Sequence, residues 1–292
     1  MSRPPRIMYA LLLSFVPAAV AQNMGTGLYA FGSYDARGFD TVNIGNLNTH
    51  FEIPIVNKQG RGLPFNYTLA YDGLIWSPSG NGSGSWQPDS GWGFHGALLG
   101  GGFAGYLEVR ELRVSCGPPI GRFPNFGYMS YFAYHDPYGR RHSFNYHLKS
   151  CESGDTQTGN GSTSDGSGYS YGINDGMVYT RSGQVINAPQ SNSAMASSRI
   201  TDSNGNSVSN NGNGTFTDTL GVTALTIGGS GTAASPLTLS YPVTLQSDSA
   251  TSATATIYYK TYTVQTNFQC SGITEYPVTS VDLMDHITLP DA

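Results

Sequence analysis

The sequence predicts an all-β fold, built from antiparallel sheets or sandwich-like segments, with little helix after an export signal. Runs of alternating apolar and polar residues recur along the chain, as in strands that have one buried face. Residues that favour turns separate these runs. The chain of 292 residues holds 11% charged residues, 38 glycines and 19 tyrosines, whereas an average domain has about 25% charged residues. Such a composition is typical of extracellular β proteins.

Residues 1–21 have the three-part pattern of a cleaved secretory signal. Two arginines precede an apolar run from Ile7 to Val16, and small residues follow up to Ala21. The run is shorter than the ~20 residues that span a bilayer, and no later stretch is long and apolar enough to do so. We therefore expect a secreted or surface-held protein without a membrane span.

The charge pattern argues against nucleic acid as a partner. The formal net charge is −5, and no basic cluster remains after the signal to pair with phosphates. No motif in the chain indicates a cofactor.

Three runs give the clearest strand predictions. Residues 64–71 alternate aromatic or aliphatic side chains with small or polar ones. Residues 237–245 alternate in the same way, although Pro242 lacks a ladder donor and predicts an edge position. The run Thr254–Phe268 is rich in Thr, Tyr, Val and Ile, which suits a bent strand or a tight hairpin.

Turns and polar segments suggest how the chain is divided. Gly, Asn, Asp and Pro cluster at four predicted turns, Tyr71–Gly73, Asp136–Gly139, Asp175–Gly176 and Ser203–Asn206. Residues 77–91 and 152–170 are rich in Gly, Ser, Asn and Asp, and we predict loops there. We divide the mature chain into a first β region (22–151), a linker with a hairpin (152–198) and a second β region (199–292). The second region ends on a turn phrase, and we expect it to be truncated at its C-terminal end.

The three cysteines predict one disulfide. Cys116 and Cys151 each close a strand-like run, so we expect them to pair and Cys270 to be free. The competing interpretation, a metal site, needs ligands at a short spacing such as C-x₂-C, which the chain lacks.

No motif predicts a catalytic site. Residues 168–172 match the G-x-S-x-G pattern of hydrolases around Ser170, but no helix pattern follows, and the only downstream histidine is His286. The acidic residues are scattered, and no pair stands out as the two carboxylates of a glycosidase.

Four residues around one predicted turn could present ligands to a metal, namely His135, Asp136, His142 and His147. His142 and His147 would point to opposite faces of a strand, because side chains alternate. We therefore favour ordinary hairpin residues and expect no metal.

Trp76, Trp86 and Trp92 lie around the first polar segment. They could form a platform on which a sugar ring stacks, as exposed aromatic residues do in extracellular modules. The simpler interpretation is hydrophobic packing beneath the loop.

Several phrases, in order, resemble the region before the repeats of bacterial rearrangement-hot-spot (RHS) proteins, also called YD-repeat proteins. The first phrases are Val42–Leu47, Ile53–Ile55, Gly60–Asp72 and Gly91–Phe94. Tyr134–Phe144, Ile200–Asn206 and Phe216–Gly221 are similar to hairpins of the family, and the chain ends at His286–Ala292 on a turn that resembles the entry to its first repeats. The resemblance covers residues 38–150 and 199–292, and the tandem YD repeats themselves are absent.

The resemblance implies a structural role without catalysis. Members of the family wind long β-sheets into hollow shells that can enclose a toxic C-terminal part, or display them at the bacterial surface. We therefore expect an exported segment that starts or plugs such a shell and whose partners are further YD repeats of the same polypeptide. The alternatives are a secreted β-sandwich adhesin or carbohydrate-binding module that recognises cell-surface glycans, and a secreted hydrolase.

Overall fold

The computed structural model describes residues 25–28, 32–37, 39–79, 84–89, 91–95, 101–118, 125–190, 196–244 and 250–290. The predicted signal, residues 1–21, lies outside them. The described residues form antiparallel sheets, as the sequence predicts, and their only helix is the single turn α1 (Gly101–Ala104).

The first third of the chain forms a five-stranded sheet and a separate two-stranded ribbon. The sheet has the order β1-β2-β3-β4-β7. Its strands are β1 (Tyr34–Arg37), β2 (Asp40–Asn43), β3 (Thr49–Lys58), β4 (Phe65–Asp72) and β7 (Phe94–His95). The ribbon pairs β5 (Trp76–Pro78) with β6 (Trp86–Pro88).

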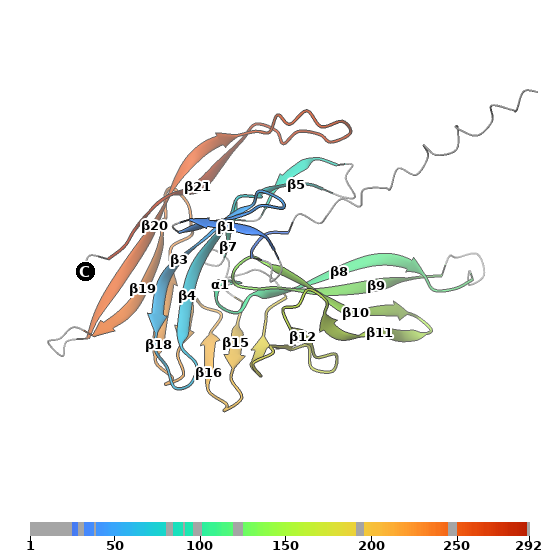
Figure 1. The fold of residues 1–292 in the computed structure, drawn as a ribbon, viewed down its shortest axis with the longest axis horizontal. Helices are drawn as coiled ribbons and strands as arrows, with labels where there is room; N and C mark the ends of the chain where they lie inside the picture. Colours follow the sequence, from blue (N-terminus) through green and yellow to red (C-terminus); the bar gives the residue numbers. More distant parts are fainter. Residues whose placement is uncertain are drawn as a thin grey trace, which may run out of the picture.

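All later strands belong to one 14-stranded antiparallel sheet, in which they follow one another in chain order from β8 to β21. They are β8 (Tyr106–Ser115), β9 (Phe126–His135), β10 (Arg141–Cys151), β11 (Gly154–Thr163), β12 (Ser170–Tyr171), β13 (Val178–Tyr179), β14 (Val185–Asn187), β15 (Ser198–Thr201), β16 (Ser207–Asn210), β17 (Thr215–Thr217), β18 (Thr223–Gly228), β19 (Leu237–Thr244), β20 (Ala250–Val264) and β21 (Thr279–Thr288). The large sheet curves around β3, β4 and α1 (Figure 1). Its strands β11–β14 lie within residues 152–198, the predicted linker and hairpin.

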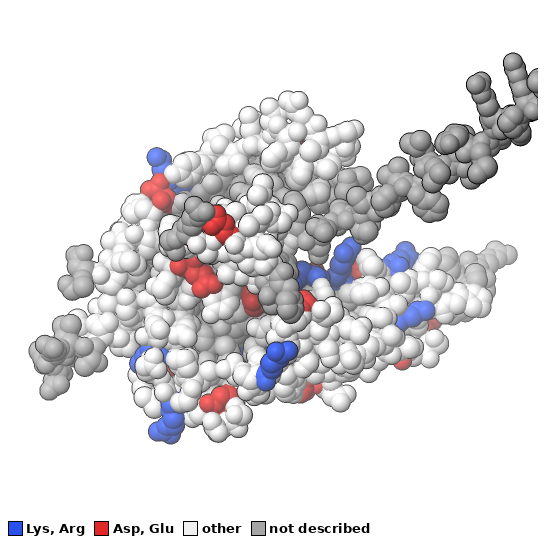
Figure 2. Space-filling view, in the orientation of Figure 1, with Lys and Arg blue, Asp and Glu red and all other residues white. Residues whose placement is uncertain are grey.

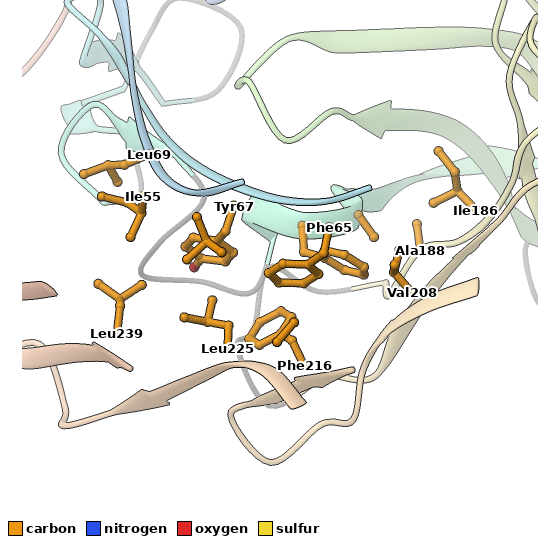
Figure 3. Close-up of a cluster of buried hydrophobic side chains, with 14 of the residues drawn as sticks. Ile55, Phe65, Tyr67, Leu69, Ile186, Ala188, Val208, Phe216, Leu225 and Leu239 are labelled. Atoms are coloured by element: carbon orange, nitrogen blue, oxygen red, sulfur yellow. The ribbon is translucent and has the colours of Figure 1, made fainter. Parts of the chain in front are cut away.

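The main core lies between β4 and the concave face of the large sheet. Phe65, Tyr67 and Leu69 alternate along β4 and are fully buried, as the pattern of residues 64–71 predicts. Their side chains meet Phe216 and Leu225 of the large sheet (Figure 3). The ring centroids of Phe216 and Tyr67 are 5.6 Å apart. Burying one face of β4 in this way holds the five-stranded sheet inside the curve of the large one.

Four hairpin turns of the large sheet share one hydrogen-bonding pattern. They begin at Asp136, Thr180, Asp202 and Asp218. In each, the first and fifth residues are joined by a backbone hydrogen bond, and the fourth is a glycine with φ between 76° and 84°. The side-chain oxygen of the first residue accepts the N–H of the fifth. Glycine is favoured at the fourth position because other residues rarely adopt a positive φ.

The outer halves of β8–β11 project beyond the curved part of the large sheet as an arm, formed by residues 109–116, 125–131 and 147–158 (Figure 1). A disulfide between Cys116 and Cys151 closes its outer end, with the two Cα atoms 5.9 Å apart. This is the predicted pair, and Cys270 is free and exposed. The bridge passes Gly127 of β9, where an added Cβ would lie 2.5 Å from Sγ of Cys116.

Three predictions from the sequence need correction. The predicted loop 152–170 is wrong for its first half, because β11 pairs with β10 there. The predicted loop 77–91 includes β6, which pairs with β5. In both places backbone hydrogen bonds form strands that bury little, so a polar composition does not reveal them. Pro242 does not lie in an edge strand, because β19 lies between β18 and β20. The pairing of β19 with β18 covers only Thr238–Ser240 of β19. Pro242 therefore lies past the end of the ladder between these two strands.

Charged side chains are sparse on the molecular surface. On the face shown in Figure 2, Lys, Arg, Asp and Glu lie in small separate groups, and most of the area is neither basic nor acidic. Among the described residues, none of the helices is long and apolar enough to cross a membrane.

Candidate functional site

The three tryptophans named from the sequence lie in one aromatic cluster. Trp76 and Trp86 come from the ribbon β5–β6, and Trp92 precedes β7. The cluster is completed by Phe268 and Tyr276, from the long connection between β20 and β21. No local sequence pattern predicts these two partners, because they are almost 200 positions away along the chain.

The tryptophan rings pack against their neighbours at steep angles. The centroids of Trp76 and Trp92 are 5.5 Å apart with an interplanar angle of 86°, and Trp86 lies 4.8 Å from Phe268 at 59°. A sugar platform needs an open ring face, whereas here edges and faces of the rings contact one another. The geometry therefore favours the packing interpretation, in which the cluster fastens the ribbon to the β20–β21 connection. Ligand stacking at these rings stays a prediction.

The two edge strands of the large sheet, β8 and β21, are candidate interaction surfaces. β21 carries Asp282, Asp285 and His286. The Oγ1 hydroxyl of Thr261 donates to Asp282 at 2.6 Å, and the Tyr262 hydroxyl donates to Asp285 at 2.8 Å. Both donors lie on β20, so these carboxylates brace the β20–β21 hairpin. Because an edge strand presents unpaired backbone groups, β21 can accept a further strand.

A buried carboxylate fastens the inner sheet together. Asp72, at the end of β4, is fully buried. Its Oδ1 accepts hydrogen bonds from the N–H of Gly27 at 2.8 Å and from the amide of Asn48, and Nδ1 of His50 lies 3.1 Å away. Nε2 of His95 lies 3.1 Å from Oδ2. Asp72 thus connects β3, β4, β7 and the segment before β1.

The contacts of Asp72 determine its charge and that of His50. Burial opposes ionisation of Asp72, but the hydrogen bonds from His50, His95 and Asn48 outweigh it and hold its pKa well below the usual range. Burial likewise opposes protonation of His50, but Asp72 outweighs it and raises the pKa of His50. The sequence pattern at Tyr71–Gly73 predicts only a turn residue at Asp72. Nothing in its local sequence distinguishes a buried aspartate from a turn aspartate.

The predicted histidine cluster around the Asp136 turn separates into three environments. His142 is buried between two carboxylates, with Nδ1 2.6 Å from Asp165 Oδ2 and Nε2 3.1 Å from Asp136 Oδ2. His135 stacks on Tyr106, and His147 lies beside Tyr131. The described residues contain no group of three or more His, Cys, Asp or Glu placed to hold a metal ion.

Asp165 joins the His142 centre to its neighbours. Burial opposes ionisation of Asp165, but hydrogen bonds from Ser167 and contact with His142 lower its pKa to about 2. Nη2 of Arg140 lies 3.3 Å from the same carboxylate, and Nη1 donates to the carbonyl of Leu28 at 3.1 Å. This network fixes the turn at Asp136 against the segment before β1.

Ser170 lies in a setting unlike a hydrolase elbow. It belongs to the two-residue strand β12 and pairs with Ser162 and Tyr179. The chain continues into a turn and the strand β13, whereas a nucleophile elbow leads from a strand into a helix.

Comparisons with protein-family models, with curated proteins and with solved structures find no match for this chain.

Proposed function

We propose that this chain is an exported, non-catalytic structural segment of an RHS/YD-repeat protein. In this proposal it begins or plugs a β-shell, either at the bacterial cell surface or as part of a scaffold that delivers a toxin. A cleaved signal at residues 1–21 exports it. Further repeats of the same polypeptide are its partners.

The observation that carries this proposal is the construction of the large sheet. Fourteen strands pair strictly in chain order, so the sheet grows by adding one hairpin after another. Four of its turns repeat one pattern, at Asp136, Thr180, Asp202 and Asp218. A sheet made in this way has no internal limit to its length, because each new hairpin pairs only with the one before it.

The five-stranded sheet supports the plug role. It lies inside the curve of the large sheet (Figure 1) and is held there by the buried face of β4. A curved sheet needs its concave face covered, since apolar residues on that face would otherwise contact water. The five-stranded sheet covers the concave face of the large sheet, whose strands would be the first strands of the proposed shell.

The edge strand β21 is where further repeats would pair. If that edge normally has a partner, the chain of residues 22–292 should self-associate at micromolar concentration, because unpaired strands template association. Extending the chain through the downstream repeats should give a monomer. The DNA directly after codon 292 tests the same proposal, which requires tyrosine-aspartate repeats in frame.

Ser280→Lys places a charge on the exposed edge of β21 and should reduce self-association, because edge lysines block strand pairing. Ser271→Lys adds the same charge in the exposed turn between β20 and β21, and it should leave association unchanged. Size-exclusion chromatography with light scattering measures both variants. A stable monomer of the unaltered chain, or equal effects of the two lysines, would contradict the proposal. Labelling of Ser170 by a fluorophosphonate probe would contradict its non-catalytic part.

A further inference from the structure

A cavity of about 320 Å³ lies between the outer face of β4 and the wall of the large sheet formed by β9, β14, β15, β16 and the turns beside β12 and β13. Ile186 and Val208, at one end of the main core (Figure 3), also border it. This volume is at the small end of the range of ligand sites, which limits a ligand to about the size of one or two sugar rings.

Aromatic rings form one part of the cavity lining. Tyr134 is fixed, because its hydroxyl donates to the carbonyl of Ala104 at 2.9 Å. The ring of Tyr169 packs against it at 5.0 Å, and the half-exposed Tyr138 borders the cavity from the Asp136 turn. Tyr134 is itself fully buried, so the accessible apolar ring surface for a ligand comes from Tyr138 and the partly buried Tyr169.

Neutral polar side chains form another part. Asn66 and Thr68 come from the face of β4 that points away from the main core, and Gln184 follows the glycine of the Thr180 turn. The side chains of Asn66, Thr68 and Gln184 make no hydrogen bond to another described residue. They are therefore available to a ligand as two amides and a hydroxyl.

The charges near the cavity select against anions. None of its lining residues is Asp, Glu, Lys or Arg. Glu52 and Asp136 are close enough to Tyr138 to add to the effect of burial in raising its pKa. The positive charge of Arg140 also acts on Tyr169 of the lining, but Asp136 and Asp165 act on the same residue with the opposite sign. An anionic ligand would therefore leave water without gaining a net positive charge at the cavity.

We propose that this cavity binds a neutral saccharide of one or two pyranose rings. A pyranose has an apolar C–H face that suits the tyrosine rings, and its hydroxyls suit the free amides and the threonine hydroxyl. The site is separate from the tryptophan cluster, and the proposal does not depend on the proposed function as a shell segment.

The test is titration of the full chain with four neutral disaccharides, lactose, maltose, cellobiose and chitobiose, and with glucuronate, followed by isothermal calorimetry and saturation-transfer NMR. At least one neutral disaccharide should bind with a Kd of about 1 mM or lower, and glucuronate should not. The absence of binding by all four up to about 10 mM, or equal binding of glucuronate, would overturn the proposal.

Variants locate the site. Gln184→Leu and Thr68→Val keep the side-chain shape but remove the hydrogen-bonding groups, and each should weaken binding about tenfold. Gln157→Leu makes the same change on the exposed strand β11 of the arm, and it should not affect binding. Equal thermal melts of the variants would show that each is folded. Binding that survives both Gln184→Leu and Thr68→Val would place the sugar elsewhere and overturn the assignment.

Discussion

In the part of the large sheet that covers β4, side chains alternate between a buried and an open face, whereas most residues of the arm are exposed. Phe216 and Leu225 are fully buried in the first region. In the arm, Leu112 is 42% exposed and Tyr128 is 54% exposed. Both regions belong to one antiparallel sheet, so the difference lies in what covers the strands and not in how they pair.

The two regions therefore depend on different forces. The main core is stabilised by removing the apolar area of aromatic and aliphatic side chains from water. No described part of the chain forms a second layer over the arm, and in place of burial the arm has strand hydrogen bonds and the Cys116–Cys151 disulfide. A part of a sheet that extends beyond its covering layer can thus remain ordered if a covalent bond restricts the unfolded conformations of its strands.

Removing one ring from the main core should give the largest effect. Phe216 contacts Phe65, Tyr67 and Phe103, and Phe216→Ala should lower the free energy of unfolding by about 3–5 kcal/mol, because it leaves a cavity among rings. The matched change in the arm, Tyr128→Ala, should cost less than about 1 kcal/mol. Urea unfolding measures both. Similar losses for the two variants would remove the distinction between core and arm.

Breaking the disulfide should act mainly on the arm. The bridge closes a loop with a sequence separation of 35, which corresponds to about 3–4 kcal/mol in the chain-entropy estimate. In the double variant Cys116→Ser, Cys151→Ser, amide exchange in the arm should become about 100-fold faster or more, while exchange in β4 stays unchanged. Mass spectrometry of exchanged peptides resolves the two regions. Equal acceleration in both would mean that the arm and the core open together.

The sequence predicts the core strand and the disulfide well, because both depend on local patterns. Alternation alone identifies the buried face of β4, and the cysteines end two strand-like runs. The two strands that these cysteines end are not neighbours, because β9 lies between β8 and β10. Gly127 of β9 leaves room for the disulfide to pass over that strand. Nothing in the sequence distinguishes this glycine among the 38 that the chain contains.

Long-range contacts limit the prediction of the candidate sites. Trp76 was recognised as a candidate, but its partners Phe268 and Tyr276 come from another end of the chain. The cavity combines Thr68, Tyr134 and Gln184, which belong to separate strands and turns. The turns at Thr180 and Asp218 repeat the hydrogen-bonding pattern of the turn at Asp136. The turn at Thr180 is difficult to recognise in the sequence because its first residue is a threonine and not an aspartate. Only the fold brings such residues together.

The smallest effect is expected at the junction of the core and the arm, where Glu108 of β8 contacts two neighbouring strands. Nε2 of His135 lies 2.8 Å from Glu108 Oε2, and Nε of Arg141 donates to the same oxygen at 2.7 Å. The hydrogen bond with His135 is the main cause that lowers the pKa of Glu108 to about 2, from an ordinary 4.5, and Arg141 adds to it. The partly exposed carboxylate is screened by solvent, which keeps its contribution modest.

A carboxyl whose pKa is depressed by folding stabilises the native state above its unfolded pKa and loses this effect as the pH falls through the folded value. The contribution of Glu108 should therefore be complete above about pH 5 and disappear between about pH 4.5 and pH 2. Glu108→Gln removes the charge and keeps the shape, so the stability gap between it and the unaltered protein should narrow across that window. Urea unfolding at several pH values measures the gap, with Glu152→Gln, in the exposed turn between β10 and β11, as the control for losing one negative charge. A gap that is independent of pH would mean that the contacts with His135 and Arg141 do not connect the arm to the core electrostatically.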